Sequence, residues 1–154
     1  MHISASITTP MQILPTLLVG FAAAFIAWQQ LQVAQNKLRL DLFDRRYKVY
    51  DATRKFLASI FSNATFTDSQ LFEFYAGTSD AEFLFGSEVV DYLAQVKYRA
   101  LNMLKYQKIY ECMPAGEERS RHVDAAFIER SWLEEQLTAI TKTFTPYLGF
   151  SHIQ

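Results

Sequence analysis

The sequence predicts an all-α chain, in which one N-terminal transmembrane helix continues into a cytoplasmic antiparallel helical bundle that includes two short helices. Three observations support this fold class. Glycine and proline are scarce, with 5 and 4 copies in 154 residues, so helix breakers are few. Apolar residues recur every three or four positions in three long segments. The longest of these contains neither glycine nor proline between Gly20 and Phe61.

A membrane span is predicted at residues 13–33. From Ile13 to Trp28 only a proline, a threonine and a glycine interrupt an apolar run, and the flanking residues extend it toward the roughly 20 residues that a span needs. A cleaved signal peptide would need a basic segment before the apolar run, and none is present. A buried soluble helix would need more covering surface than the remaining chain offers. We therefore expect residues 1–12 to form a short external lead-in and 34–154 a cytoplasmic bundle.

The charges around this span predict its orientation. No lysine or arginine precedes it, whereas Lys37, Arg39, Arg45, Arg46 and Lys48 all follow it. Because basic residues stay on the cytoplasmic side of a membrane, the N-terminus is expected outside and the C-terminal domain in the cytoplasm.

Small residues within the span indicate a helix-packing face. Gly20 and Ala24 are four residues apart, as are Ala23 and Ala27. This spacing lets two helix backbones approach closely in lipid, although alanine is also common in spans that do not associate. The pattern favours self-association.

After the span, the long helix carries two neighbouring apolar stripes that together are wider than a coiled-coil seam. The first consists of Leu40, Phe43, Tyr47, Tyr50, Leu57 and Phe61. The second consists of Leu38, Leu42, Val49, Ala52, Phe56 and Ile60. Pairs of opposite charge spaced by four occupy the remaining surface, namely Asp41–Arg45, Asp44–Lys48 and Asp51–Lys55. Such a helix is expected to be covered from two sides.

Three further elements precede the last helix. The long helix is expected to end at Ser62–Asn63, and short helices are predicted at 69–76 and 79–85, each followed by glycine. A longer helix is predicted from Ser87, which would serve as its N-cap, to about Cys112. Its inner stripe comprises Val89, Leu93, Val96, Ala100, Met103 and Leu104.

The last helix is predicted to begin at Glu117 and to end near Thr145, because Pro146 follows. Its expected inner residues are Val123, Phe127, Leu133, Leu137, Ile140 and Phe144. The apolar residues Tyr147, Leu148 and Phe150 predict that the tail docks on the bundle.

Composition limits the function classes. A formal net charge of −1 argues against a general binder of duplex nucleic acid. Cys112 is the only cysteine, which excludes an intrachain disulfide and suits a reducing compartment. Cys112 and His122 are too few ligands for a zinc site, and no catalytic motif is found. We therefore expect no enzymatic activity, no cofactor and no metal.

Two basic groups are candidates for binding a small anion such as a nucleotide. Arg45 and Arg46 lie in the segment DLFDRRYKVYD, and arginine is suited to phosphate. Lys97, Lys105 and Lys108 alternate with tyrosines on one predicted helix, an arrangement that can combine charge with stacking. The alternatives are local ion pairing for the arginines and a solvated basic face for the lysines.

Three segments in this order resemble a group of small uncharacterised bacterial single-pass membrane proteins with a cytoplasmic helical domain. They are LDLFDRRYKVYDA, FLFGSEVVDYL and FTPYLGF. The resemblance covers most of the chain beyond residue 37 and implies a bacterial inner-membrane protein. It implies no activity.

Together these features favour a membrane-anchored, non-enzymatic interaction or scaffold protein. Its expected partners are the lipid bilayer, other copies of itself, and another membrane or cytoplasmic protein, but no nucleic acid duplex. The alternative hypothesis is a membrane effector whose cytoplasmic bundle senses a small anionic ligand and signals along the continuous helix to the span.

Overall fold

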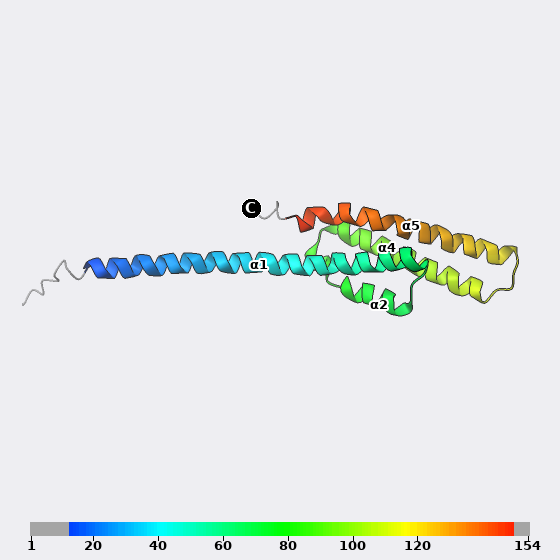
Figure 1. Ribbon diagram of the computed structural model, residues 1–154, viewed down its shortest axis with the longest axis horizontal. Coiled ribbons are helices and arrows are strands. Elements are labelled where there is room, and N and C mark those ends of the chain that lie inside the picture. The colour runs from blue at the N-terminus through cyan, green and yellow to red at the C-terminus, as the bar shows by residue number, and fades with distance from the viewer. Residues whose placement is uncertain (1–12, 150–154) are drawn as a thin grey trace, which may run out of the picture. The chain divides into compact units, whose positions relative to one another are not determined.

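A computed structural model describes the backbone of residues 13–149 and the side chains of residues 18–149. The described residues form helices and no strand, which confirms the all-α class (Figure 1). The helices are α1 (Ile13–Asn63), α2 (Asp68–Gly77), α3 (Ala81–Leu84), α4 (Ser87–Glu111) and α5 (Glu117–Leu148). The chain divides into two units, Met1–Asp41 and Leu42–Gln154. The predicted helices are all present, including the two short ones.

Unit 1 contains the first part of α1. Residues from Leu18 to Val33 are exposed, including every large apolar side chain in this stretch. Within the part of the chain that is described, no helix combines the length and the apolar character of a membrane span. The span at 13–33 therefore stays a prediction, and the lead-in at 1–12 lies outside the described residues.

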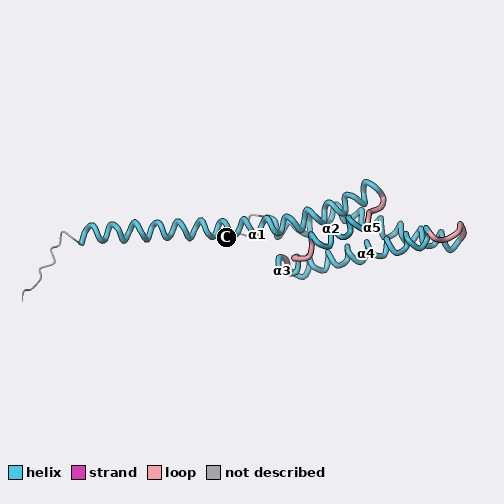
Figure 2. The backbone as a smooth tube through the Cα atoms, turned by 90° about the horizontal axis from the view of Figure 1, so that it is seen from below, coloured by secondary structure: helices cyan, strands magenta, loops and turns pink. Residues whose placement is uncertain are grey.

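The core of unit 2 is built on the second apolar stripe of α1. Val49, Phe56 and Ile60 are buried, together with Leu57 of the first stripe. The inner stripe predicted for α4 is confirmed, since Val89, Leu93, Val96, Ala100 and Met103 are buried and Leu104 packs against the core. On α5, Leu133, Ile140 and Phe144 are buried. Figure 2 shows these helices alongside one another.

Two predicted inner residues of α5 are exposed instead. Val123 is 42% and Phe127 57% exposed, and Phe61 near the end of α1 is 64% exposed. In the ribbon view and in the tube view, the α4–α5 hairpin continues past the end of α1 (Figures 1 and 2). The first turns of α5 therefore lack the helix that covers its later turns, although their apolar spacing is the same.

Local chemistry ends or begins several helices. Ala64 closes α1 in the left-handed region, at φ 57°, and donates its N–H to Ile60 O at 2.9 Å. Thr67 and Gln70 form a reciprocal capping box at the start of α2. The prediction that Ser87 caps α4 is wrong. Gly86 occupies the cap position without a side-chain hydrogen bond, and Ser87 is the first helical residue.

The prediction that α5 ends near Thr145 is also wrong, because the helix passes through Pro146 to Leu148. Proline removes one backbone hydrogen bond, but the Gly149 N–H donates to Thr145 O at 3.0 Å and closes the last turn. Tyr147 and Leu148 pack against the core, as predicted. Phe150 lies outside the described residues.

We predict that Gly77→Ala destabilises unit 2. A Cβ at Gly77 would lie 2.6 Å from the Ala52 Cβ, so α2 would have to move away from α1. Overpacking of this kind costs about 1–3 kcal/mol, more than the roughly 0.5–1 kcal/mol that alanine gains over glycine in a helix. Urea unfolding of the full chain measures the change in the free energy of unfolding.

The matched control is Gly116→Ala, because a Cβ at Gly116 meets nothing within 4 Å. The double variant Ala52→Gly, Gly77→Ala should be more stable than the sum of its single changes predicts, since it removes the clashing methyl group. Equal unfolding midpoints for Gly77→Ala and the wild type would contradict the close contact.

Candidate functional site

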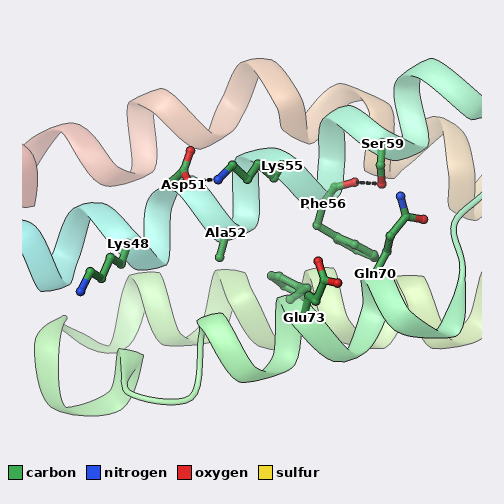
Figure 3. Close-up of a pocket in the computed structure, with 9 residues that line it drawn as sticks. Lys48, Asp51, Ala52, Lys55, Phe56, Ser59, Gln70 and Glu73 are labelled. Atoms are coloured by element: carbon green, nitrogen blue, oxygen red, sulfur yellow. Dashed lines mark hydrogen bonds and ion pairs between the residues drawn. The ribbon is translucent and has the colours of Figure 1, made fainter.

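Unit 2 contains a cleft between α1 and α2, with a volume of about 280 Å³ (Figure 3). Its α1 wall is formed by Lys48, Asp51, Ala52, Lys55, Phe56 and Ser59. Its α2 wall is formed by Gln70, Glu73 and Phe74. The site combines charged side chains with an aromatic surface.

Packing explains where this cleft lies. At Gly77 the absence of a side chain lets α2 approach Ala52 of α1 closely. About one turn away on each helix, the rings of Phe56 and Phe74 stack with centroids 4.6 Å apart and planes within 5°. Both rings are almost completely buried. The two helices are thus held by small residues at one level and by large ones at the next, and the cleft lies over that transition.

The charges of the cleft balance. Lys55 Nζ lies 2.6 Å from Asp51 Oδ2, which confirms one of the three predicted pairs. The hydrogen bond from Lys55 to Asp51 and the attraction between their charges raise the pKa of the lysine. Glu73 accepts a hydrogen bond from Ser69 at 3.5 Å. With Lys48 the walls carry two cationic and two anionic side chains, so the cleft has no net preference for an anion.

Arg46 has a different role from the one considered for anion binding. Its Nε donates to Leu84 O at 3.0 Å and its Nη1 to Tyr147 O at 3.4 Å. Its guanidinium also lies 6.0 Å from the Phe85 ring centroid and 5.7 Å from that of Tyr147. A cation is favourable at these carbonyls because both belong to helix C-termini. Arg46 therefore holds the ends of α3 and α5, while Arg45 is exposed.

The three candidate lysines of α4 differ in their surroundings. Lys97 Nζ lies 5.0 Å from the Tyr75 ring centroid and 5.9 Å from that of Phe74, and burial lowers the pKa of its amine. Lys108 Nζ lies 3.7 Å from Asp68 Oδ2. Lys105 is exposed. Lys97 and Lys108 thus contact α2, and within residues 18–149 none of the three lysines contacts Arg45 or Arg46.

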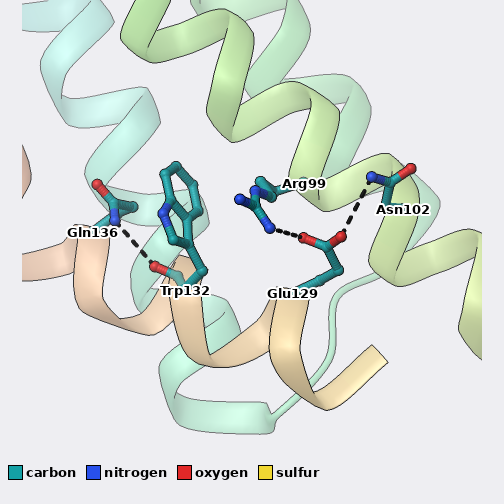
Figure 4. A network of polar contacts seen from close by, with 5 residues as sticks. All are labelled: Arg99, Asn102, Glu129, Trp132 and Gln136. Carbon is teal, nitrogen blue, oxygen red and sulfur yellow. Dashed lines mark hydrogen bonds and ion pairs between the residues drawn. The ribbon is translucent and has the colours of Figure 1, made fainter. Parts of the chain in front are cut away.

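A polar network that sequence reasoning missed joins α4 to α5 (Figure 4). Glu129 is 8% exposed and accepts hydrogen bonds from Arg99 Nη1 at 3.0 Å and Asn102 Nδ2 at 3.4 Å. The Arg99 guanidinium lies 5.2 Å from the Trp132 ring centroid. One signal was available, since Glu129 stands four residues before the buried Leu133 and so falls on the inner stripe of α5. The network satisfies a buried carboxylate and fixes how the two helices pair.

The remaining predicted residues lie elsewhere. Gly20, Ala23, Ala24 and Ala27 are exposed in unit 1, and a Cβ at Gly20 would meet nothing within 4 Å. Cys112 is exposed, and the ring of His122 lies 6.0 Å from that of Tyr106. Within residues 18–149 no three His, Cys, Asp or Glu side chains gather as metal ligands would.

We predict that Arg46→Met lowers the free energy of unfolding by about 1–3 kcal/mol, because two helix-terminal carbonyls lose a charged hydrogen-bond donor. Arg45→Met is the matched control, and its exposed position predicts a change within about 0.5 kcal/mol. Thermal unfolding of both variants measures the difference. Equal stability of the two variants would contradict a structural role for Arg46.

No protein-family model matches the chain, and no curated protein or solved structure matches it either. Its function is therefore inferred from the fold and the contacts described above.

Proposed function

We propose that this chain is a membrane-anchored, non-enzymatic helical interaction protein of the bacterial inner membrane, and that its copies associate through unit 1. The observation that carries the proposal is a run of exposed, uncharged apolar residues on α1. Eight large apolar side chains between residues 18 and 33 are each 54–74% exposed. They are Leu18, Val19, Phe21, Phe25, Ile26, Trp28, Leu31 and Val33.

The distribution of these side chains around the helix favours a lipid environment. At about 100° per residue they cover roughly two thirds of the helix circumference. A helix that packs against one soluble partner needs only an apolar stripe and keeps a polar face for water. No charged residue occurs from Ile13 to Asn36, and the stretch from Phe21 to Trp28 contains only apolar residues, so that stretch has no such solvated face.

The charge pattern supports the orientation. The first basic residues after the apolar segment are Lys37 and Arg39, and no lysine or arginine precedes it. The positive-inside rule then places unit 2 in the cytoplasm. Trp28 lies near the end of the apolar run, where an aromatic ring suits the membrane interface.

The remaining third of the circumference carries Gly20, Ala23 and Ala27, with Ala24 at its edge. A glycine inside a helix costs roughly 0.5–1 kcal/mol relative to alanine. Among the described residues nothing requires a glycine at position 20, because a Cβ there meets open space. Close approach of a second helix in lipid would use this small face and account for the glycine.

Sensing of a small anionic ligand is not part of this proposal. Arg46 is engaged by helix termini, and the charges of the α1–α2 cleft balance. Lys97 and Lys105 belong to a different surface from the cleft.

We predict that the full chain stays in the membrane pellet after alkaline carbonate extraction, because a span is held by apolar burial rather than by charge. A fluorescent protein fused after Gln154 should fluoresce, and alkaline phosphatase at the same place should be inactive. Release of the chain by carbonate, or an active phosphatase fusion, would overturn the membrane proposal.

We predict that Gly20→Ile with Ala24→Ile weakens self-association by about tenfold or more, because branched side chains keep the two backbones apart. Sedimentation equilibrium in detergent micelles measures the association constant. The control is Ala22→Ile, which enlarges a residue about 160° away from Gly20 on the helix. A monomeric wild-type protein, or equal weakening by the control, would contradict association through the small face.

A further inference from the structure

Two contacts fix the register of α2 against α4 in unit 2. Lys108 pairs with Asp68 at the beginning of α2, and Lys97 lies over the ring of Tyr75 near its end. Residue numbers therefore rise along α2 as they fall along α4, so the two helices are antiparallel. Between these two contacts, the position of a residue along α2 therefore predicts which residue of α4 lies at the same level of the seam between the two helices.

An apolar patch lies between these contacts. Phe72 stands four residues after Asp68, and Leu101 stands four residues after Lys97, which brings Phe72 and Leu101 to the same level of the seam. Phe72 is 72% and Leu101 47% exposed. Tyr98, three residues before Leu101 and so beside it on the surface of α4, is 64% exposed. Three large apolar side chains are thus presented together, whereas single exposed apolar residues are ordinary.

Positive charge lies on the α4 side of the patch, whereas the charged residues of α2 nearest to Phe72 are the acids Asp68 and Glu73. Lys108 has its carboxylate partner, but within residues 18–149 neither Lys97 nor Lys105 pairs with an acidic side chain. Lys97 is partly buried against two aromatic rings, and this loss of water lowers the pKa of its amine. An added carboxylate at Lys97 would stabilise the charged amine that burial disfavours.

We infer that the α2–α4 seam, defined by Phe72, Lys97, Tyr98, Leu101 and Lys105, binds an acidic amphipathic helix of a partner protein. The apolar face of that helix would cover Phe72, Tyr98 and Leu101, and its flanking carboxylates would pair with Lys97 and Lys105. This mode of recognition places an apolar helix face on an apolar surface, while charges at the rim set its orientation.

The same charges disfavour two other occupants. A second copy that placed its own seam on this one would bring like charges together. A bilayer surface is flat, whereas Lys97 lies partly buried beside α2, where a side chain reaches it more easily than a layer of headgroups. The proposed contact between the partner helix and the α2–α4 seam involves unit 2 alone. It does not depend on the membrane proposal.

Selection from a peptide library tests the inference without a known partner. The full chain in detergent micelles would be the target for a phage-displayed library of random peptides about 16 residues long, a length that forms about four helical turns. We expect the enriched peptides to carry apolar residues at three- and four-residue spacing with aspartate or glutamate beside them. Fluorescence anisotropy then measures the affinity of the synthetic peptides.

The variant Lys97→Met, Lys105→Met should bind the selected peptides about tenfold more weakly or worse, and Phe72→Ala should have a comparable effect. The matched control is Arg45→Met, Lys142→Met, which removes the same charge from exposed positions away from the seam. Circular dichroism establishes that each variant is folded. Raising the salt concentration should weaken binding to the wild type more than to the double variant.

Three results would overturn the inference. The first is enrichment of basic or uncharged peptides, or of none. The second is equal binding of acidic peptides to the wild type and the seam variants. The third is binding of vesicles containing anionic lipid that the seam variants lose while peptide binding is unchanged, which would assign the surface to lipid.

Discussion

Unit 2 depends on the burial of one face of α1, which is formed by Val49, Thr53, Phe56, Leu57 and Ile60. Thr53, Leu57 and Ile60 are completely buried, so helices must cover this part of α1 from more than one direction. The Phe56 ring stacks on Phe74 of α2, which anchors the short helix. Six residues before Phe56 on α1, the Tyr50 ring lies 5.6 Å from the Phe144 ring of α5, which is the longest of the covering helices. Because each contact uses a different side of this face, a large loss of side-chain volume there would loosen several helices at once.

Polar side chains complete this arrangement where apolar packing ends. Arg46 reaches backbone carbonyls at the ends of two helices, and Glu129 is satisfied by two donors from α4. These groups could not stay partly or wholly buried without such partners, because an unsatisfied charge costs several kcal/mol. Their contacts add direction to the packing, since a bidentate donor or carboxylate is satisfied in few geometries. Arg46 and Glu129 therefore stabilise the fold of unit 2.

The predictable parts of the fold were those that depend on periodicity. The spacing of Val89, Leu93 and Val96 indicates one buried helix face, whichever helix packs against it. The structure confirms that all three are buried. Phe127 has the same kind of spacing but is exposed, because coverage depends on where α1 ends in space. Pro146 stops a helix by local rules, yet a docked last turn overrides them. Likewise, the sequence shows that Arg46 is basic but not that two helix ends converge on it. Long-range partners decide such cases, and spacing along one helix does not contain them.

The buried charged side chains and the exposed apolar side chains of the described residues are in different situations. In the described part of unit 2 the charged side chains that are most buried bind helix ends or each other. Large apolar side chains stay exposed in both units, at Phe21 and Trp28 in unit 1 and at Phe72 and Leu101 in unit 2. Covering apolar surface lowers the free energy of the system by about 25 cal/mol per Å². The described residues leave both surfaces exposed, and association with lipid or protein would cover them.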